Sequence, residues 1–357
     1  MRFHIINLPH TQATKQYNAC AFTQNVMNFC KMMHSLNHEV YFYGSEGSQV
    51  DCTEHIITIT NEQRNNWFGH NNWKKDFFDI DFNPNLPYWI ISNQSAINEI
   101  KKRIQPNDFI CLIGGNCHKQ IADAFPNNKS VEFAIGYEGV FTKYRVFPSY
   151  AWMHYIHGWL KEDGNENDVV IPHYFDVNEF PFSQEKDNFY LFIARLIPRK
   201  GFDIAVDACR RTNSKLIMAG QGVIDKVPGK IIGQGFIIEG SHVEHIGSIG
   251  IKERGQLMSR AKAVLVPTKY IGPFESVHVE AMFCGTPVIT TDWGAFTETV
   301  INGENGFRIK NVDQMVEAMS KLNTLSPQKI RDYAISKFSM DVVKYQYENY
   351  FNNLLNK

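Results

Sequence analysis

The feature that most constrains the fold of this 357-residue chain is an alternation of short apolar runs and helical stretches in its second half. Each apolar run has the length of a buried strand, and each intervening stretch has the length and spacing of a helix. Strands connected through helices pair in parallel, with right-handed crossovers. The predicted strands are 190–195, 215–220, 243–246, 263–268 and 287–291, and the predicted helices are 202–211, 252–260 and 276–283.

The first half begins with the same pattern. Near residue 169 the sequence pattern changes, and this change separates the two halves. Here the predicted strands are 2–7, 40–44, 55–59, 109–114 and 131–136, and the predicted helices are 21–36, 93–104 and 118–125. The segment 61–90 fits no element, and the aromatic run 147–160 is interpreted mainly as core. We therefore predict an α/β fold of two Rossmann-like, doubly wound parallel-sheet domains that face a central cleft.

Composition excludes several classes of protein. The 36 basic and 37 acidic residues nearly balance, so no nucleic-acid partner is expected. Seven cysteines without a CxxC pair argue against a zinc ribbon or a disulfide framework. No apolar run is long enough for a transmembrane segment, and the first residues lack the apolar core of a signal peptide. We expect a cytoplasmic protein, for which a peripheral membrane contact stays open.

Two cations follow the strand predicted at 190–195. Arg195 ends this strand and Lys200 precedes the next helix, so both lie at the carboxyl edge, where open α/β sheets bind ligands. An arginine can bind two phosphate oxygens at once, and a lysine adds a point charge. The pair suits a diphosphate, although a solvated basic loop explains either cation equally well when it is taken alone.

A second candidate feature is the start of the helix predicted near Glu275. Backbone amides at a helix start form an anion site, and Glu280, one turn further, could accept hydrogen bonds from a ribose diol. For each residue alone, an ordinary helix position is the commoner explanation. Their placement together with the two cations favours a ligand site. The amides concerned are those of Phe274, Glu275, Ser276 and Val277.

Six segments in order resemble the retaining glycosyltransferases of family 4, which have the GT-B fold. Together they cover about half of the chain and their combined pattern is specific. The segments are IPHYFDVNEF (171–180), ARLIPRKG (194–201), KLIMAGQG (215–222), VEHIGSI (243–249), GPFESVHVEAMFCGTPVI (272–289) and WGAFTETVINGENGF (293–307).

The resemblance implies transfer of a hexosyl-type sugar, with retention of configuration, from a nucleotide-sugar (UDP- or GDP-linked) to a hydroxyl of a glycan, lipid or other acceptor. The nucleotide-sugar is a co-substrate, and neither a metal nor another cofactor is expected. Arg195 and Lys200 would hold the diphosphate and Glu280 the ribose. Gly220 and Gly222 correspond to the donor-side turn of the family, and the amides of residues 274–277 would hold phosphate and sugar.

One position departs from the family pattern. The family places a glutamate that touches the donor sugar eight residues before the position of Glu280, and Gly272 stands there in this chain. Glu275 occupies a position at which the family commonly has glycine. Either Glu275 substitutes from this shifted place, as a catalytic candidate, or the sugar pocket differs.

The first half matches the family less well. Many relatives have a histidine in this half that touches the donor sugar, and His118, His10 and His154 stay open as candidates. Other candidates for the cleft lie in loops that follow predicted strands. They are Thr11, Gly115 and Glu138.

We expect an acceptor-binding domain at 1–172, to which a last helix within 338–357 returns, and a donor-binding domain at 173–337. Two alternatives stay open: a catalytically silent protein of this fold that binds sugar nucleotides or glycans, and a nucleotide-sugar epimerase.

Overall fold

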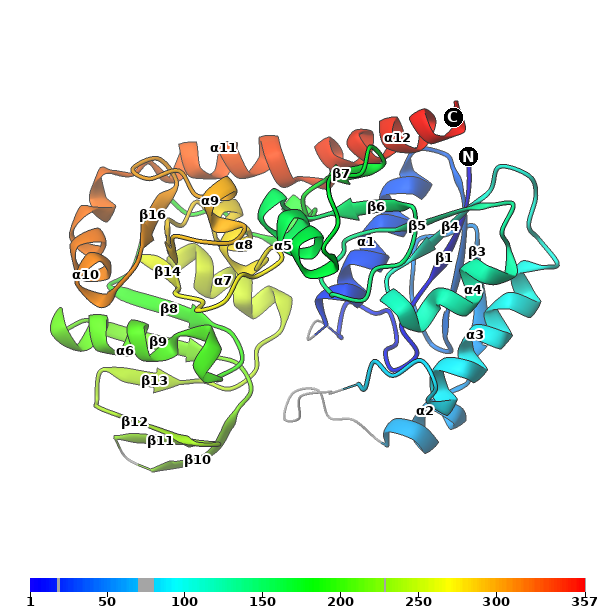
Figure 1. The fold of residues 1–357 in the computed structure, drawn as a ribbon. Coiled ribbons are helices and arrows are strands. Elements are labelled where there is room, and N and C mark those ends of the chain that lie inside the picture. Colours follow the sequence, from blue (N-terminus) through cyan, green and yellow to red (C-terminus); the bar gives the residue numbers. More distant parts are fainter. Residues whose placement is uncertain (18–19, 70–79, 228, 357) are drawn as a thin grey trace. The chain divides into compact units, whose positions relative to one another are not determined.

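A computed structural model describes residues 1–17, 20–69, 80–227 and 229–356. The chain divides into two compact units (Figure 1). Among these residues, unit 1 runs from Met1 to Tyr174 and resumes at Met340, whereas unit 2 is the continuous segment Phe175–Ser339.

Unit 1 is built on a seven-stranded parallel sheet of order β3-β2-β1-β4-β5-β6-β7. From β1 the chain adds β2 and β3 on one side and then β4 to β7 on the other. The strand order thus reverses between β1 and β4, and this switch point is where such sheets bind ligands. The strands are β1 Arg2–Ile6, β2 Glu39–Ser45, β3 Glu54–Ile59, β4 Phe109–Leu112, β5 Lys129–Glu132, β6 Tyr144–Phe147 and β7 Asp168–Val170.

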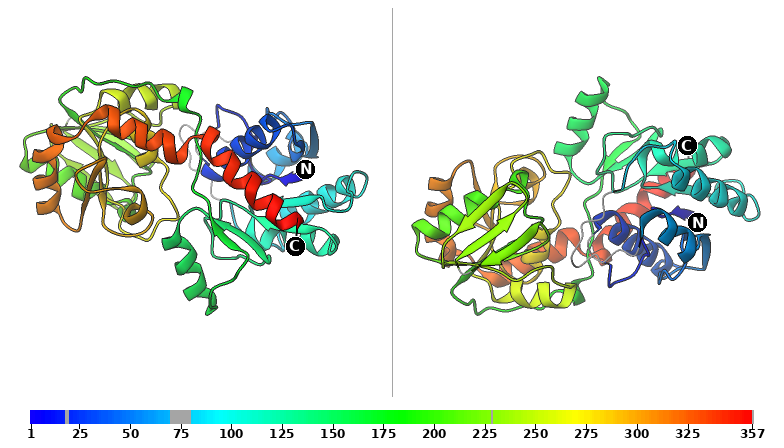
Figure 2. Two further views of the ribbon diagram at one scale, coloured as in Figure 1. Left: turned by 90° about the horizontal axis from the view of Figure 1, so that it is seen from above. Right: turned by 90° about the horizontal axis from the view of Figure 1, so that it is seen from below.

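The helices of unit 1 include the last helix of the chain. In α12 the ring of Phe351 lies 4.8 Å from that of Phe3 on β1, and the ring of Tyr347 lies 5.0 Å from Phe29 on α1. The final helix therefore completes the core that the first strand begins, and it runs beside α1 (Figures 1 and 2). The helices are α1 Ala21–Ser35, α2 Asn61–Phe68, α3 Pro87–Ile100, α4 Lys119–Ala124, α5 Tyr150–Leu160 and α12 Met340–Leu355.

Unit 2 contains a six-stranded parallel sheet of order β13-β9-β8-β14-β15-β16. Its strand order reverses between β8 and β14. The strands are β8 Phe189–Ile193, β9 Lys215–Ala219, β13 Val243–His245, β14 Ala263–Val266, β15 Val288–Thr291 and β16 Gly306–Ile309. A small antiparallel sheet is inserted between β9 and β13; its strands are β10 Val223–Val227, β11 Lys230–Gly233 and β12 Phe236–Glu239.

Helices cover the larger sheet of unit 2, and their apolar faces share its core. They are α6 Phe202–Arg211, α7 Ile251–Arg260, α8 Val277–Phe283, α9 Phe296–Thr299, α10 Val312–Lys321 and α11 Pro327–Phe338.

The predicted strand–helix alternation is confirmed in both units, although several elements differ locally from the prediction. Helix α3 begins at Pro87 rather than at residue 93, because proline suits the first turn of a helix. Strand β5 ends at Glu132, although the prediction extended it to residue 136. The run 147–160 forms the end of β6 and helix α5. Its residues Phe147, Trp152 and Ile156 are core, as predicted, whereas Tyr150 and Trp159 are exposed. Of the unplaced segment 61–90, residues 70–79 lie outside the described part.

Candidate functional site

The candidate site of unit 2 lies at its switch point. The loop that follows β8 (residues 194–201, the β8 loop) and the loop that follows β14 (residues 267–276, the β14 loop) leave adjacent strands. The amide of Lys269 donates to the Arg199 carbonyl at 2.8 Å and joins the two loops. Gly201 has φ +74°, and a Cβ on it would lie 1.9 Å from the Pro267 carbonyl oxygen. Only glycine permits this approach.

The predicted donor-side glycines support the β8 loop from behind. A Cβ on Gly220, which has φ +142°, would lie 1.9 Å from the Ala194 carbonyl oxygen. A Cβ on Gly222 would lie 2.9 Å from that of Leu196. Both glycines therefore allow the turn after β9 to pack against the β8 loop, which is the reason this turn needs glycine.

Lys200 is the cation that the two loops enclose. Its Nζ donates to Glu275 Oε2 at 2.5 Å and to the Tyr270 hydroxyl at 2.8 Å. The hydroxyl of Tyr270 in turn donates to Glu275 Oε1 at 2.5 Å. Sequence reasoning predicted Lys200 and Glu275 as site residues, and the structure brings them together. It missed Tyr270, because no motif signals a tyrosine in this loop.

Arginines flank this group. The guanidinium of Arg199 lies 3.8 Å from the centroid of the Tyr270 ring, and Arg195 is exposed on the same loop. Burial, followed by the negative charge of Glu275, raises the pKa of the Tyr270 phenol. This hydroxyl is therefore neutral near pH 7, and it adds no negative charge to that of Glu275. Arg199 is a second residue that sequence reasoning missed.

The backbone of Glu275 is held in an unusual conformation. Its φ is +62°, in the left-handed region that residues other than glycine rarely adopt. His278 Nδ1 donates to the Glu275 carbonyl at 2.6 Å. Burial lowers the pKa of His278 to about 4, so the ring is neutral and fixes this carbonyl without adding charge.

Glu280 lies on α8 and is buried. Arg254 of α7 places its Nε 3.1 Å from Glu280 Oε2, in an orientation that makes no hydrogen bond. Burial raises the pKa of the carboxyl, and Arg254 opposes this effect. Glu280 is thus not the surface residue that its position in a helix commonly implies, and its Oε2 keeps the capacity to accept a hydrogen bond.

The remaining candidates of unit 2 surround the start of α8. The side chain of Phe274 is buried in the core and stacks on Phe175, so only its backbone can face a ligand. Ser276 is the N-cap of α8 and Val277 is its first residue.

In unit 1, four candidates follow the two strands that flank its switch point. His10 and Thr11 come after β1, and Gly115 and His118 come after β4. His118 is buried and its Nδ1 accepts from the Gly114 amide at 3.1 Å. Burial lowers the pKa of His118 to about 3, so the imidazole is neutral.

The other three of these candidates are also enclosed by neighbouring groups. His10 is buried, with its pKa lowered to about 3, and Thr11 Oγ1 bonds Thr23 Oγ1 at 2.7 Å inside the core. Gly115, at φ +56°, allows close approach to the Gly139 carbonyl.

Glu138 and His154 lie on the exposed surface of unit 1. Glu138 accepts a hydrogen bond from Tyr155 at 2.7 Å, and His154 is exposed on α5.

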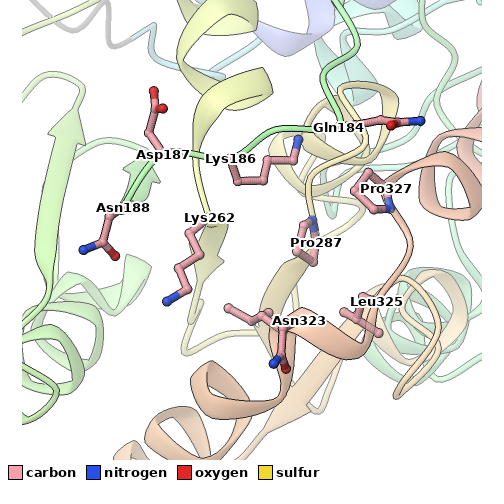
Figure 3. A pocket seen from close by; sticks show the side chains of 10 residues that line it. Gln184, Lys186, Asp187, Asn188, Lys262, Pro287, Asn323, Leu325 and Pro327 are labelled. Carbon is pink, nitrogen blue, oxygen red and sulfur yellow. The ribbon is translucent and has the colours of Figure 1, made fainter.

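A cavity of about 440 Å³ lies at the opposite edge of the unit 2 sheet (Figure 3). Asn188, Lys262 and Pro287 line it and immediately precede β8, β14 and β15, so it opens at the amino edge. Lys186 runs along its wall and donates to the carbonyls of Ser259 and Cys284, at the ends of α7 and α8. This cavity is therefore separate from the β8 and β14 loops.

Two features are absent from the described residues. No group of three or more His, Cys, Asp or Glu residues there is placed to hold a metal ion. No helix in that part of the chain has both the length and the apolar character needed to span a bilayer.

Comparison with known sequences finds similarity over unit 2. Residues 176–337 match the model of the family described as glycosyl transferases group 1. An uncharacterised glycosyltransferase of Methanocaldococcus jannaschii is 35% identical over 155 residues, which are 43% of this chain and 42% of the relative. A phosphatidyl-myo-inositol mannosyltransferase of Mycobacterium tuberculosis is 28% identical over 160 residues, 42% and 41% of the two chains. The alignments thus span about two fifths of these relatives, and the match to the family model covers nearly all of unit 2.

Solved structures resemble the whole chain in fold. AviGT4, a glycosyltransferase involved in avilamycin A biosynthesis, has a TM-score of 0.70 at 18% identity, over 99% of this chain and 98% of its own. Sucrose-phosphate synthase of Thermosynechococcus elongatus has a TM-score of 0.73 at 15% identity, over 99% of both chains. HepE of Anabaena, in complex with UDP and glucose, has a TM-score of 0.65 at 14% identity, over 99% and 100%. The predicted GT-B class, with two parallel-sheet α/β domains, is confirmed.

Proposed function

We propose that this protein is a glycosyltransferase that moves a sugar from a UDP- or GDP-sugar to a hydroxyl of a glycan, lipid or other acceptor, with retention of configuration. The observation that carries the proposal is the group of cations at the switch point of unit 2. Lys200 and Arg199 are held there by contacts between the two loops, and Arg195 lies on the same loop. A diphosphate is a ligand that matches such a group.

The proposed chemistry follows from this charge distribution. When the bond between sugar and phosphate breaks, negative charge collects on the departing nucleoside diphosphate. Lys200 and Arg195 would stabilise that charge electrostatically, so no metal ion is required. Glu280, buried nearby on α8, is the proposed acceptor of hydrogen bonds from the ribose hydroxyls. The acceptor would bind to unit 1.

The family match over unit 2 supports the reaction class, and HepE supports a UDP-sugar among the donors to be tried first. The specific donor and acceptor are to be found by experiment. The full chain is incubated with a panel of UDP- and GDP-sugars, and release of the nucleoside diphosphate and of free sugar is followed. We expect slow donor hydrolysis with one member of the panel, and NMR of the first product should show the anomeric configuration of the donor.

A second function, a catalytically silent binder of sugar nucleotides, is favoured by one observation. Gly272 stands where the family has the glutamate that touches the donor sugar. Tight binding of a sugar nucleotide, with neither hydrolysis nor transfer for any donor and acceptor tried, would decide for the binder and against the transferase.

A further inference from the structure

The ammonium of Lys200 already has a counter-ion within the protein. Lys200, Tyr270 and Glu275 form a closed ring of three hydrogen bonds at 2.5 to 2.8 Å. The side chains of Lys200 and Glu275 are only 14% and 10% exposed. Salt and water therefore screen this ion pair much less than a surface pair.

The carboxylate of Glu275 occupies space that only a glycine at position 272 leaves open. A Cβ built on Gly272 would lie 2.7 Å from Glu275 Cγ and 2.8 Å from Oε1. On another side, a Cβ on Gly294 would lie 3.2 Å from the Gly272 amide nitrogen. The backbone of Gly272 is thus enclosed, and the residue types at positions 272 and 275 depend on each other.

The protein holds Glu275 in this place against the preference of its backbone. A left-handed conformation at a residue other than glycine persists only where surrounding contacts enforce it. Here His278 holds the Glu275 carbonyl, and Lys200 and Tyr270 hold its carboxylate. All of these groups belong to the chain, so the ion pair between Lys200 and Glu275 forms without a bound ligand.

We propose that Glu275 is an internal counter-ion that masks Lys200 until a diphosphate arrives. The proposal rests on the proposed function only in taking the β8 loop as a diphosphate site. An incoming diphosphate has to take over the ammonium from Glu275, and the carboxylate then repels it. Nucleoside diphosphates therefore bind more weakly than the cations alone would allow, and the product nucleotide leaves more readily.

The test measures binding of inorganic pyrophosphate to the full chain by titration calorimetry. Glu275→Gln removes the charge and keeps the size of the side chain. We expect pyrophosphate to bind roughly tenfold more tightly to this variant, because one close negative charge is lost. The matched control is Glu244→Gln, which removes an exposed carboxylate paired with Lys215 at 2.7 Å in the same unit and should leave the affinity unchanged.

A second variant displaces the carboxylate without removing it. In Gly272→Ala the three atoms nearest to the new Cβ all belong to the flexible side chain of Glu275, which has to shift, and we expect this shift to weaken its contact with Lys200. Pyrophosphate should again bind more tightly. Gly250→Ala, where a Cβ meets nothing within 4 Å, is the control for a methyl group in the same unit.

An unchanged or weaker affinity for pyrophosphate in both variants overturns the proposal, as does an absence of pyrophosphate binding to every variant. The gain in affinity for pyrophosphate should also vanish in the double variant Lys200→Ala/Glu275→Gln, because the cation that Glu275 masks is then missing. If the variants bind pyrophosphate more tightly but no donor is ever turned over, the role of Glu275 as a counter-ion is supported and the proposed transferase activity is refuted. If a donor is turned over but the variants gain no affinity for pyrophosphate, the transferase activity is supported and the counter-ion role is refuted.

Discussion

At the scale of single residues, Glu280 is the proposed ligand of the ribose, and its charge should distinguish the nucleoside part of a ligand from the phosphates. It is buried on α8, and its contact with Arg254 leaves Oε2 able to accept a hydrogen bond. A carboxylate in this state can bind a diol, whereas it would repel a phosphate.

Glu280→Gln should therefore weaken binding of UDP or GDP by about tenfold, the loss expected when a charge-assisted hydrogen bond becomes a neutral one. Binding of pyrophosphate, which has no ribose, should change little. Calorimetric titration of the variant with both ligands checks this. An equal loss for both ligands would contradict the assignment of the ribose to Glu280.

A second prediction at this scale concerns Lys200 and Arg195, the two predicted phosphate ligands. Lys200→Ala and Arg195→Ala should each slow turnover by about 30- to 1,000-fold, equivalent to about 2 to 4 kcal/mol of transition-state stabilisation. Initial rates of nucleotide release with saturating donor measure this effect. Lys269→Ala is the control, because this lysine of the β14 loop is exposed and paired with Asp203. Rates near that of the wild type in both variants would refute the assigned site.

At the scale of elements, the site depends on how closely the β8 and β14 loops approach. Gly201→Ala places a Cβ against the Pro267 carbonyl and forces a left-handed backbone on alanine. We expect a loss of more than about 1 kcal/mol in the free energy of unfolding, together with weaker pyrophosphate binding. Gly164→Ala, where a Cβ meets nothing, should be neutral or slightly stabilising in the same denaturant titration. Equal stability of the two variants would show that the loops are not constrained by this contact.

The elements that the sequence could predict are those with a regular apolar period. Such periods indicate the alternation of β8, α6, β9, α7, β14 and α8, and this alternation is enough to place Arg195 and Lys200 at a carboxyl edge. The sheet β10–β12 was missed, because its strands are short and Gly229 and Gly235 lie in the turns between them.

Contacts between side chains of different loops were not predictable. Tyr270 lies 70 positions after Lys200 and reaches it only because β8 and β14 are neighbours in the sheet. The contact of Arg254 with Glu280 depends in the same way on the packing of α7 on α8. The sequence predicted Arg195, Lys200, Glu275 and Glu280 at the site but neither Arg199 nor Arg254, and the structure determined which charges lie beside one another.

At the scale of the whole molecule, buried histidines in both units make stability depend on pH. Burial lowers the pKa of His118 in unit 1 to about 3 and that of His278 in unit 2 to about 4. In the unfolded chain each has a pKa near 6.5. Their contribution is fully present above pH 6.5 and is lost as the pH falls from 6.5 towards 4, because only the unfolded chain takes up the protons.

Each histidine should lower the free energy of unfolding by about 1.4 kcal/mol per pH unit within this window. Denaturant unfolding between pH 7 and pH 5 measures the slope, with separate transitions allowed for the two units. In His118→Gln, the slope of the free energy of unfolding against pH should be smaller by the contribution of one proton. If the free energies of unfolding of the wild type and of this variant fall in parallel as the pH is lowered, the account of His118 is contradicted.

The return of α12 to unit 1 has a consequence for the order of events during synthesis. Within the described residues, unit 2 is one continuous segment, so all of its described strands have left the ribosome once residue 339 has emerged. Unit 1 lacks Tyr347 and Phe351, which fill its core against Phe29 and Phe3, until the last helix appears. Unit 1, whose first strands precede unit 2 in the chain, therefore receives this part of its core only after the strands of unit 2 have been made.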